Sequence, residues 1–200
     1  MRSIQSVIAM LAAMVLVFGL SGCGYNRLQT QDEQVIAAWS EVVNQYQRRA
    51  DLVDNLVKVT QEYADREAQI FTDIAKARSQ VGSVQISSDM INNPEALQKF
   101  EEAQGQLGGA LSRLLAVSER YPDLKASALF QDLNASLEGT ENRIAVARKR
   151  YIESVQAYNG TVRTFPSNLT AKVFGMERKA NFAVANEAEI ASAPQVNFGE

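Results

Sequence analysis

The side chain best placed to do chemistry in this sequence is a single thiol. The chain of 200 residues holds one cysteine, Cys23, and no histidine. Histidine is the usual general base near neutral pH and the commonest metal ligand. Its absence excludes Ser-His-Asp and Cys-His catalysis, zinc sites built from cysteine and histidine, and the Glu-x-x-His pairs of di-iron bundles. We therefore expect a protein that is not an enzyme and holds no cofactor or metal.

The segment before Cys23 resembles the signal of a bacterial lipoprotein. Arg2 supplies a short positive start, and Val7–Leu20 supplies an apolar stretch of 14 residues. Such a stretch suits the apolar region of a secretory signal and is shorter than the ~20 residues of a membrane span. The cleavage motif of that signal, Leu-(Ser/Ala)-(Gly/Ala)-Cys, is filled by Leu20, Ser21, Gly22 and Cys23. The resemblance implies cleavage before Cys23 and attachment of diacylglycerol to its sulfur, a stable anchor of two acyl chains.

Two other interpretations of this segment are open. A lone cysteine in an exported protein is sometimes a free thiol or half of an intermolecular disulfide. The apolar stretch could also remain in place as an uncleaved signal anchor. We favour lipidation because the motif, its position and the preceding apolar run agree.

The body of the chain has the periodicity of long amphipathic helices. The first is predicted to begin at a capping box formed by Thr30 and Glu33, and to continue to Gly82 without a proline or glycine. Its apolar residues form two neighbouring stripes, which indicates burial between other helices. The first stripe is interrupted by Arg49, Thr60 and Glu67. These residues would form either a polar site inside the bundle or a register-setting polar layer, and we favour the layer.

Two further long helices follow. Asn93 and Pro94 predict the start of the second helix, which ends at Pro122, and the third runs from about Ser127 to Phe165. Short connections between long helices indicate antiparallel neighbours. The predicted fold is all-α: an elongated up-and-down antiparallel bundle of three long helices, or four with short helices counted. An up-down-up order would place the C-terminal tail at the end opposite the anchor.

The predicted organisation has four parts. Residues 1–22 are the signal peptide, and residues 23–30 are the lipidated cysteine and a short linker. The helical bundle occupies residues 31–166. The tail, residues 167–200, holds a short helix near Asn168–Phe174 and is otherwise irregular.

A basic segment interrupts an otherwise acidic chain, whose formal net charge is −3. That net charge leaves no basic footprint for nucleic acid. The segment could contact anionic lipid headgroups or an acidic partner. It could instead be a solvated face with some pairs to the first helix, which we favour because exposed charges usually behave so. Its residues are Arg143, Arg148, Lys149 and Arg150.

Several short motifs, taken in order, resemble the LemA family of bacterial membrane-associated proteins. They are Tyr25-Asn26-Arg27-Leu28, Trp39-Ser40, the stretch RRADLVDNLV at 48–57, ENRI at 141–144, Arg150-Tyr151, Tyr158-Asn159 and FPSNL at 165–169. The similarity covers the chain from about Tyr25 to its end. It implies an extracytoplasmic helical bundle tethered by its N-terminus, although many relatives keep an uncleaved membrane helix where this chain has its cleavage motif. It brings no catalytic residues and no cofactor.

The sequence thus predicts a membrane-anchored envelope protein on the periplasmic side, acting as a scaffold or interaction module. Its partners would be the membrane, through the lipid on Cys23, and envelope proteins. The alternative is a carrier that binds a lipid or peptide in an apolar groove between its helices.

Overall fold

The computed structural model describes residues 2–84 and 87–182, and for residues 2–23 and 88 it gives the backbone only. Over these residues the chain forms helices and no strand. The elements are α1 (Arg2–Tyr63), α2 (Ala68–Ser83), the short 3₁₀ helix η1 (Ser88–Asn92), α3 (Pro94–Ser118), α4 (Pro122–Ala126), α5 (Ala128–Arg163) and α6 (Ser167–Val173).

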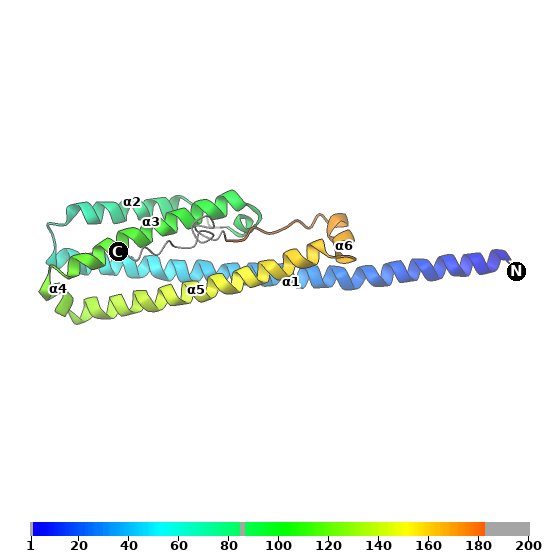
Figure 1. Cartoon of the computed structure of the whole chain (residues 1–200), viewed down its shortest axis with the longest axis horizontal. Coiled ribbons are helices and arrows are strands. Elements are labelled where there is room, and N and C mark those ends of the chain that lie inside the picture. Colours follow the sequence, from blue (N-terminus) through cyan, green and yellow to red (C-terminus); the bar gives the residue numbers. More distant parts are fainter. Residues whose placement is uncertain (1, 85–86, 183–200) are drawn as a thin grey trace, which may run out of the picture.

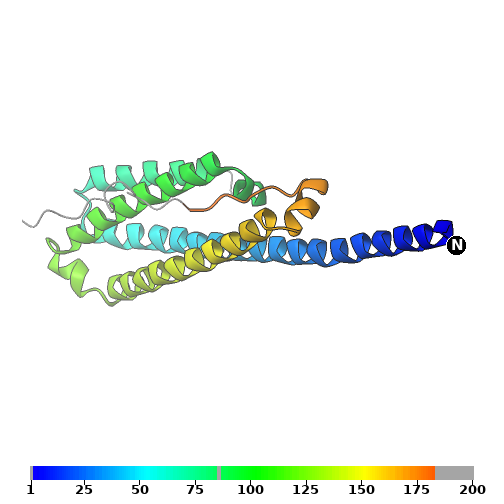
Figure 2. The same ribbon diagram turned by 45° about the vertical axis from the view of Figure 1, so that its right-hand side comes forward.

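The long helices form an antiparallel rod. Helix α1 packs along α5 and α2 packs along α3, while the short helix α4 joins α3 to α5 at one end of the rod (Figures 1 and 2). At the other end, α1 continues past its neighbours toward the N-terminus (Figure 1). The predicted all-α, elongated antiparallel bundle is confirmed.

The first predicted helix is divided in two. The chain leaves the helical path after Tyr63 and resumes at Ala68 as α2, so the order is up-down-up-down rather than up-down-up. The turn contains no proline or glycine. Folding back buries Ile74 and Ala77 of α2 in one cluster with Leu107, Leu111 and Leu114 of α3. Because burying one such isoleucine contributes roughly 1.5–3 kcal/mol, burial and not local propensity decides where α1 ends.

Glu67, one of the residues that interrupt the apolar stripe, lies at this turn. Its carboxylate accepts a hydrogen bond from the Tyr121 hydroxyl at 3.2 Å and pairs with Arg120 at 3.2 Å. Both partners follow the end of α3. These contacts therefore hold the turn between α1 and α2 next to the C-terminal end of α3.

The extra reversal moves the C-terminal part of the chain. The prediction that the tail lies at the end opposite the anchor is wrong for α6, the part that begins it. The rings of Tyr25 and Phe174 lie 4.6 Å apart between centroids, and a Cβ at Gly24 would lie 3.3 Å from the Thr170 hydroxyl. Helix α6 therefore packs against α1 immediately after Cys23. The predicted short helix in the tail is confirmed as α6.

The helix start predicted at the capping box of Thr30 and Glu33 is also wrong. Residues 24–30 are helical, and Thr30 lies inside α1 with its hydroxyl donating to the Asn26 carbonyl at 2.9 Å. The helix has no need of a cap here because it continues through Gly24 toward the N-terminus. The predicted N-cap at Asn93 is confirmed, since its side chain accepts from the Ala96 amide. The helix end predicted at Gly82 is wrong, because Gly82 lies inside α2, which continues to Ser83.

A buried polar layer divides the core into two parts. Toward α6 the core is largely aromatic, around Trp39 and Tyr151, and toward α4 it is largely aliphatic, around Leu56 and Leu114. The layer between them consists of Arg49, Gln104 and Thr140, each less than 10% exposed.

The Arg49 guanidinium occupies space next to Gly108, which has no side chain to fill it. Its guanidinium forms an ion pair with Glu141 at 2.8 Å, in a geometry that is not that of a hydrogen bond, and a Cβ at Gly108 would lie 3.0 Å from Nη2. A Cβ at Gly109, the next residue, would meet nothing within 4 Å. Of the two glycines, Gly108 alone is closely approached by a neighbouring side chain.

The two glycines give a matched pair of substitutions. Gly109→Ala should stabilise the fold by about 0.5–1 kcal/mol, because alanine is the better residue inside a helix. Gly108→Ala has the same propensity gain but must displace the buried guanidinium of Arg49, so it should stabilise less or destabilise. Free energies of unfolding from urea titrations check this. Equal gains from the two substitutions would contradict the close approach of Arg49.

Candidate functional site

The most specific arrangement of polar contacts surrounds an extended stretch of the C-terminal segment, Lys179–Phe182. The Asn159 side chain binds the Lys179 backbone at both ends, donating to its carbonyl at 2.9 Å and accepting from its amide at 2.8 Å. The Ala180 amide donates to the Ile91 carbonyl at 2.6 Å, and the Tyr151 hydroxyl donates to the Ala180 carbonyl at 2.7 Å. Backbone groups are thus held from both η1 and α5.

One side chain anchors this segment. The Phe182 ring lies 5.2 Å from that of Tyr151 and 6.2 Å from that of Trp39, and only 7% of the residue is exposed. The Arg148 guanidinium stacks over the ring at 4.2 Å from its centroid. An aromatic ring against a buried aromatic cluster and a cation contributes more than its buried area alone.

Lys179 adds an electrostatic contact. Its ammonium pairs with Asp32 of α1 at 2.7 Å and donates to the Asn92 side-chain oxygen at 3.0 Å. The lysine side chain is only 12% exposed, so this pair is less screened than those on the surface. The segment is therefore joined to α1, η1 and α5 together.

The arrangement has the chemistry of a peptide site. Hydrogen bonds to consecutive backbone groups, with one aromatic anchor, are how proteins hold an extended peptide. Here the occupant is the chain's own segment. No group of three or more metal-binding side chains is found over the described residues.

Burial alters the acidity of the tyrosines that line the site. Burial raises the pKa of the Tyr151 hydroxyl well above its ordinary value of 10.0. Burial, and then the negative charge of Asp32, raise the pKa of Tyr158. Both hydroxyls therefore stay protonated at neutral pH, and Tyr151 acts as a hydrogen-bond donor rather than a base.

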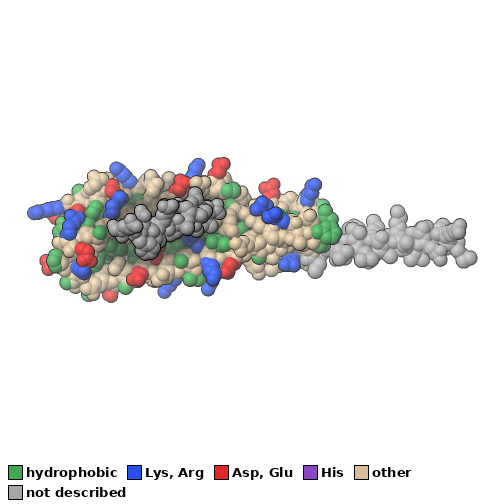
Figure 3. All heavy atoms as spheres, in the orientation of Figure 1, with side chains coloured by type: hydrophobic (Ala, Val, Ile, Leu, Met, Phe, Trp, Pro, Cys, Tyr) green, Lys and Arg blue, Asp and Glu red, His purple; other side chains and the backbone are tan. Residues whose placement is uncertain are grey.

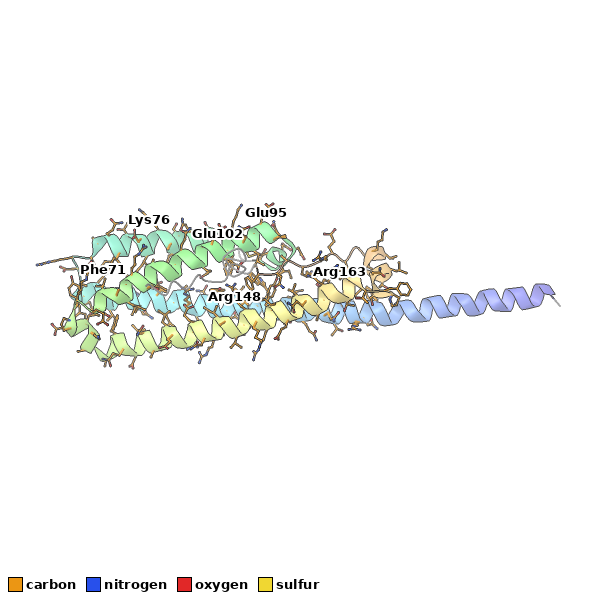
Figure 4. All side chains as sticks on the ribbon, in the orientation of Figure 1. Phe71, Lys76, Glu95, Glu102, Arg148 and Arg163 are labelled. Carbon is orange, nitrogen blue, oxygen red and sulfur yellow. The ribbon has the colours of Figure 1, made fainter. Side chains whose placement is uncertain are left out.

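The predicted basic segment is divided by the fold. Arg148 points inward from the middle of α5, where it pairs with Glu101 of α3 at 2.6 Å and contacts the Tyr46 hydroxyl at 3.3 Å (Figure 4). Arg143 and Arg150 are exposed and line a shallow surface hollow beside Glu41. Lys149 is exposed and lies 3.9 Å from Glu153. Contact of Arg143, Lys149 and Arg150 with a partner stays a prediction.

The predicted lipidation site lies where side chains are not described. Leu20, Ser21, Gly22 and Cys23 fall within the backbone of α1, and their side chains are outside the described part of the structure. Signal cleavage and lipidation therefore stay predictions. Where side chains are described, no helix combines the length and apolar character that a membrane crossing requires.

The fold and the site define an elongated helical-bundle protein whose C-terminal segment packs into its own bundle. Residues 38–198 match the LemA family, and the chain belongs to that family. The magnetosome protein MamQ 2 of Paramagnetospirillum magneticum is 29% identical to it over 196 residues, covering 90% of this chain and 70% of the relative. The magnetosome protein MamQ of Magnetospirillum gryphiswaldense is 27% identical with the same coverage. The family inferred from the sequence motifs is confirmed.

Sequence reasoning missed the residues that hold the C-terminal segment. Asn159 and Lys179 lie off the apolar stripes, and the segment itself has no helical period. The motifs Arg150-Tyr151 and Tyr158-Asn159 carried one indication, because a tyrosine buried in a helical bundle usually requires a partner for its hydroxyl. Trp39, of the motif Trp39-Ser40, lies in the core, because only 3% of it is exposed.

Removal of the Tyr151 hydroxyl should release the C-terminal segment. In Tyr151→Phe the buried Ala180 carbonyl loses its donor, which costs about 1–3 kcal/mol. The amides of Lys179 and Ala180 should then exchange faster with solvent deuterium. Tyr63→Phe, which alters an exposed tyrosine, is the control and should leave them unchanged.

The Tyr151→Phe substitution should also change how the stability of the protein depends on pH. Because the pKa of Tyr151 is raised on folding, the unfolded chain binds fewer protons above about pH 10. The stability of the unmodified protein should be complete below that pH and fall as pH rises further, and Tyr151→Phe should lack this part of the fall. Wild-type exchange rates at Lys179 and Ala180 in Tyr151→Phe would contradict the assignment.

Proposed function

We propose that this LemA-family protein is a non-catalytic envelope protein, tethered to a membrane at Cys23, that presents its helical rod to partners on the periplasmic side. The observation that carries the proposal is the unbroken run of α1 from the predicted anchor into the bundle. At 1.5 Å per residue, the far end of α1 at Tyr63 lies about 60 Å from Gly24. A tether at Cys23 would thus hold the α4 end of the rod well away from the bilayer.

The composition supports a role in interaction rather than catalysis. The chain has no histidine, and its one thiol would be consumed by the lipid. The relatives named magnetosome proteins support an association with membranes for this chain as well. Of the large apolar side chains exposed outside the α6 end, Leu129 at the start of α5 and Val146 near its middle are 57% and 51% exposed. They are natural positions at which to look for a partner.

A two-part experiment tests the proposal in bacterial membranes. Intact mass of the purified protein should show a chain that begins at Cys23 and carries acyl groups, and Cys23→Ser should abolish both changes. A photo-cross-linking residue at Leu129 or Val146 should then capture the same protein partner in repeated preparations. An unmodified chain that starts at Met1 would contradict the lipid tether. Cross-linking that recovers no reproducible partner from either position would contradict the scaffold role.

A second candidate function is peptide binding in the groove that holds Lys179–Phe182. The observation that favours it is that four hydrogen bonds there are to backbone atoms, which any extended segment carries. A partner peptide would have to displace the chain's own segment. This would make the protein a carrier whose site is closed when no partner is present.

A further inference from the structure

Exposed apolar side chains are concentrated at the α6 end of the rod. Over the described residues, four of the seven exposed large hydrophobic residues lie within ten positions of one another, in or beside α6. Figure 3 shows hydrophobic side chains gathered at this end of the body. We call these residues the base patch: Phe165, Leu169, Val173 and Phe174, which are 74%, 57%, 79% and 57% exposed.

The base patch is a face of a short helix rather than scattered residues. Leu169 and Val173 are four positions apart in α6 and so lie on one side of it. The opposite side of α6 is packed, because Ala171 is buried in the aromatic part of the core. Phe174 stacks on Tyr25 of α1, which joins the patch to the helix that carries the predicted anchor. Contiguous exposed apolar residues of this kind mark an interaction surface.

Basic side chains predominate near the base patch, although Asp32 and Glu177 line a hollow that reaches Phe174 at its margin. Residues 24–31 and 154–176 contain Arg27, Arg163 and Lys172 and no aspartate or glutamate. All three basic residues are exposed, and no ion pair to them is found over the described residues. Arg163 lies at the end of α5 next to α6 (Figure 4). Apolar side chains surrounded by unpaired basic ones are typical of surfaces that enter the headgroup region of an anionic bilayer.

We propose that the base patch is a second membrane contact, in which α6 and Phe165 insert into the bilayer interface while Arg27, Arg163 and Lys172 bind anionic headgroups. This inference rests on the proposed tether at Cys23. A Cβ at Gly24, the residue after the predicted anchor, would lie 3.3 Å from the Thr170 hydroxyl of α6. Any anchor at Cys23 therefore brings α6 to the membrane surface. The rod is then attached at two points, the lipid on Cys23 and α6, rather than by a flexible linker alone.

A fluorescence experiment on the full chain tests this inference. The protein carries its native anchor and is reconstituted in phosphatidylcholine vesicles with and without phosphatidylglycerol. A tryptophan probe replaces either Leu169 or Leu129, which are equally exposed at 57% and lie at opposite ends of the rod. The emission of Trp39, buried in the core, is common to both variants and is subtracted.

Leu169→Trp should show a blue shift in emission and quenching by brominated lipids, and both effects should increase with phosphatidylglycerol. Leu129→Trp should show neither effect, because its probe is about 50 Å further along α5. The substitution Lys172→Gln, added to Leu169→Trp, should reduce the effect of phosphatidylglycerol.

The other outcomes would contradict the base patch contact, the end-on orientation or the tether. If the chain floats with the vesicles but Leu169→Trp is not quenched, the base patch is not a membrane contact, and the tether stands. If both probes are quenched, the rod lies flat and the end-on contact is wrong. A blue shift that needs only higher protein concentration, without vesicles, would identify a contact between copies of the chain instead. If the chain does not float at all, both the tether and this inference fail.

Discussion

The reversal between α1 and α2, at which Glu67 contacts the residues that follow α3, determines where both ends of the fold lie. By accepting from Tyr121 and pairing with Arg120, Glu67 fixes the reversal between α1 and α2. The Arg120 side chain is 62% exposed, so the pair itself contributes little, about 1 kcal/mol at most. The driving force is burial of the α2 face against α3, and the polar contacts select the turn at which that burial is reached.

This reversal changes the number of long helices from odd to even. With three helices the chain would finish at the α4 end of the rod, whereas with four it returns to the end at which α1 enters the bundle. Helix α6 then lies against Gly24 and Tyr25. From there the segment up to Phe182 runs back along the bundle and fills a groove lined by α1, η1 and α5. The base patch and the occupied groove are therefore both consequences of the same turn.

The helical periodicity was sufficient to predict the class of fold and most of the core. Val35, Trp39 and Val42 on the first stripe and Tyr151, Val155 and Tyr158 on the third helix are buried as expected. The turn at residues 64–67 could not be predicted, because it contains no helix-breaking residue and depends on α3, which is distant in sequence. The one local indication of the turn in the sequence was Glu67, which stands where the first stripe would have an apolar residue. The binding of Lys179–Phe182 was equally hidden, since hydrogen bonds to backbone atoms leave little trace in the sequence of the bound segment.

We infer that the rod stands on its α6 end with the α4 end far from the bilayer. Energy transfer from a donor on the protein to acceptors in the lipid headgroups measures this height directly. Donors at Lys172, in α6, and at Lys125, in α4, report the two ends of the rod. We expect efficient energy transfer from a donor at Lys172 and little from a donor at Lys125, because about 60 Å of helix separates the two ends of the rod. Equal transfer from the two positions would contradict it.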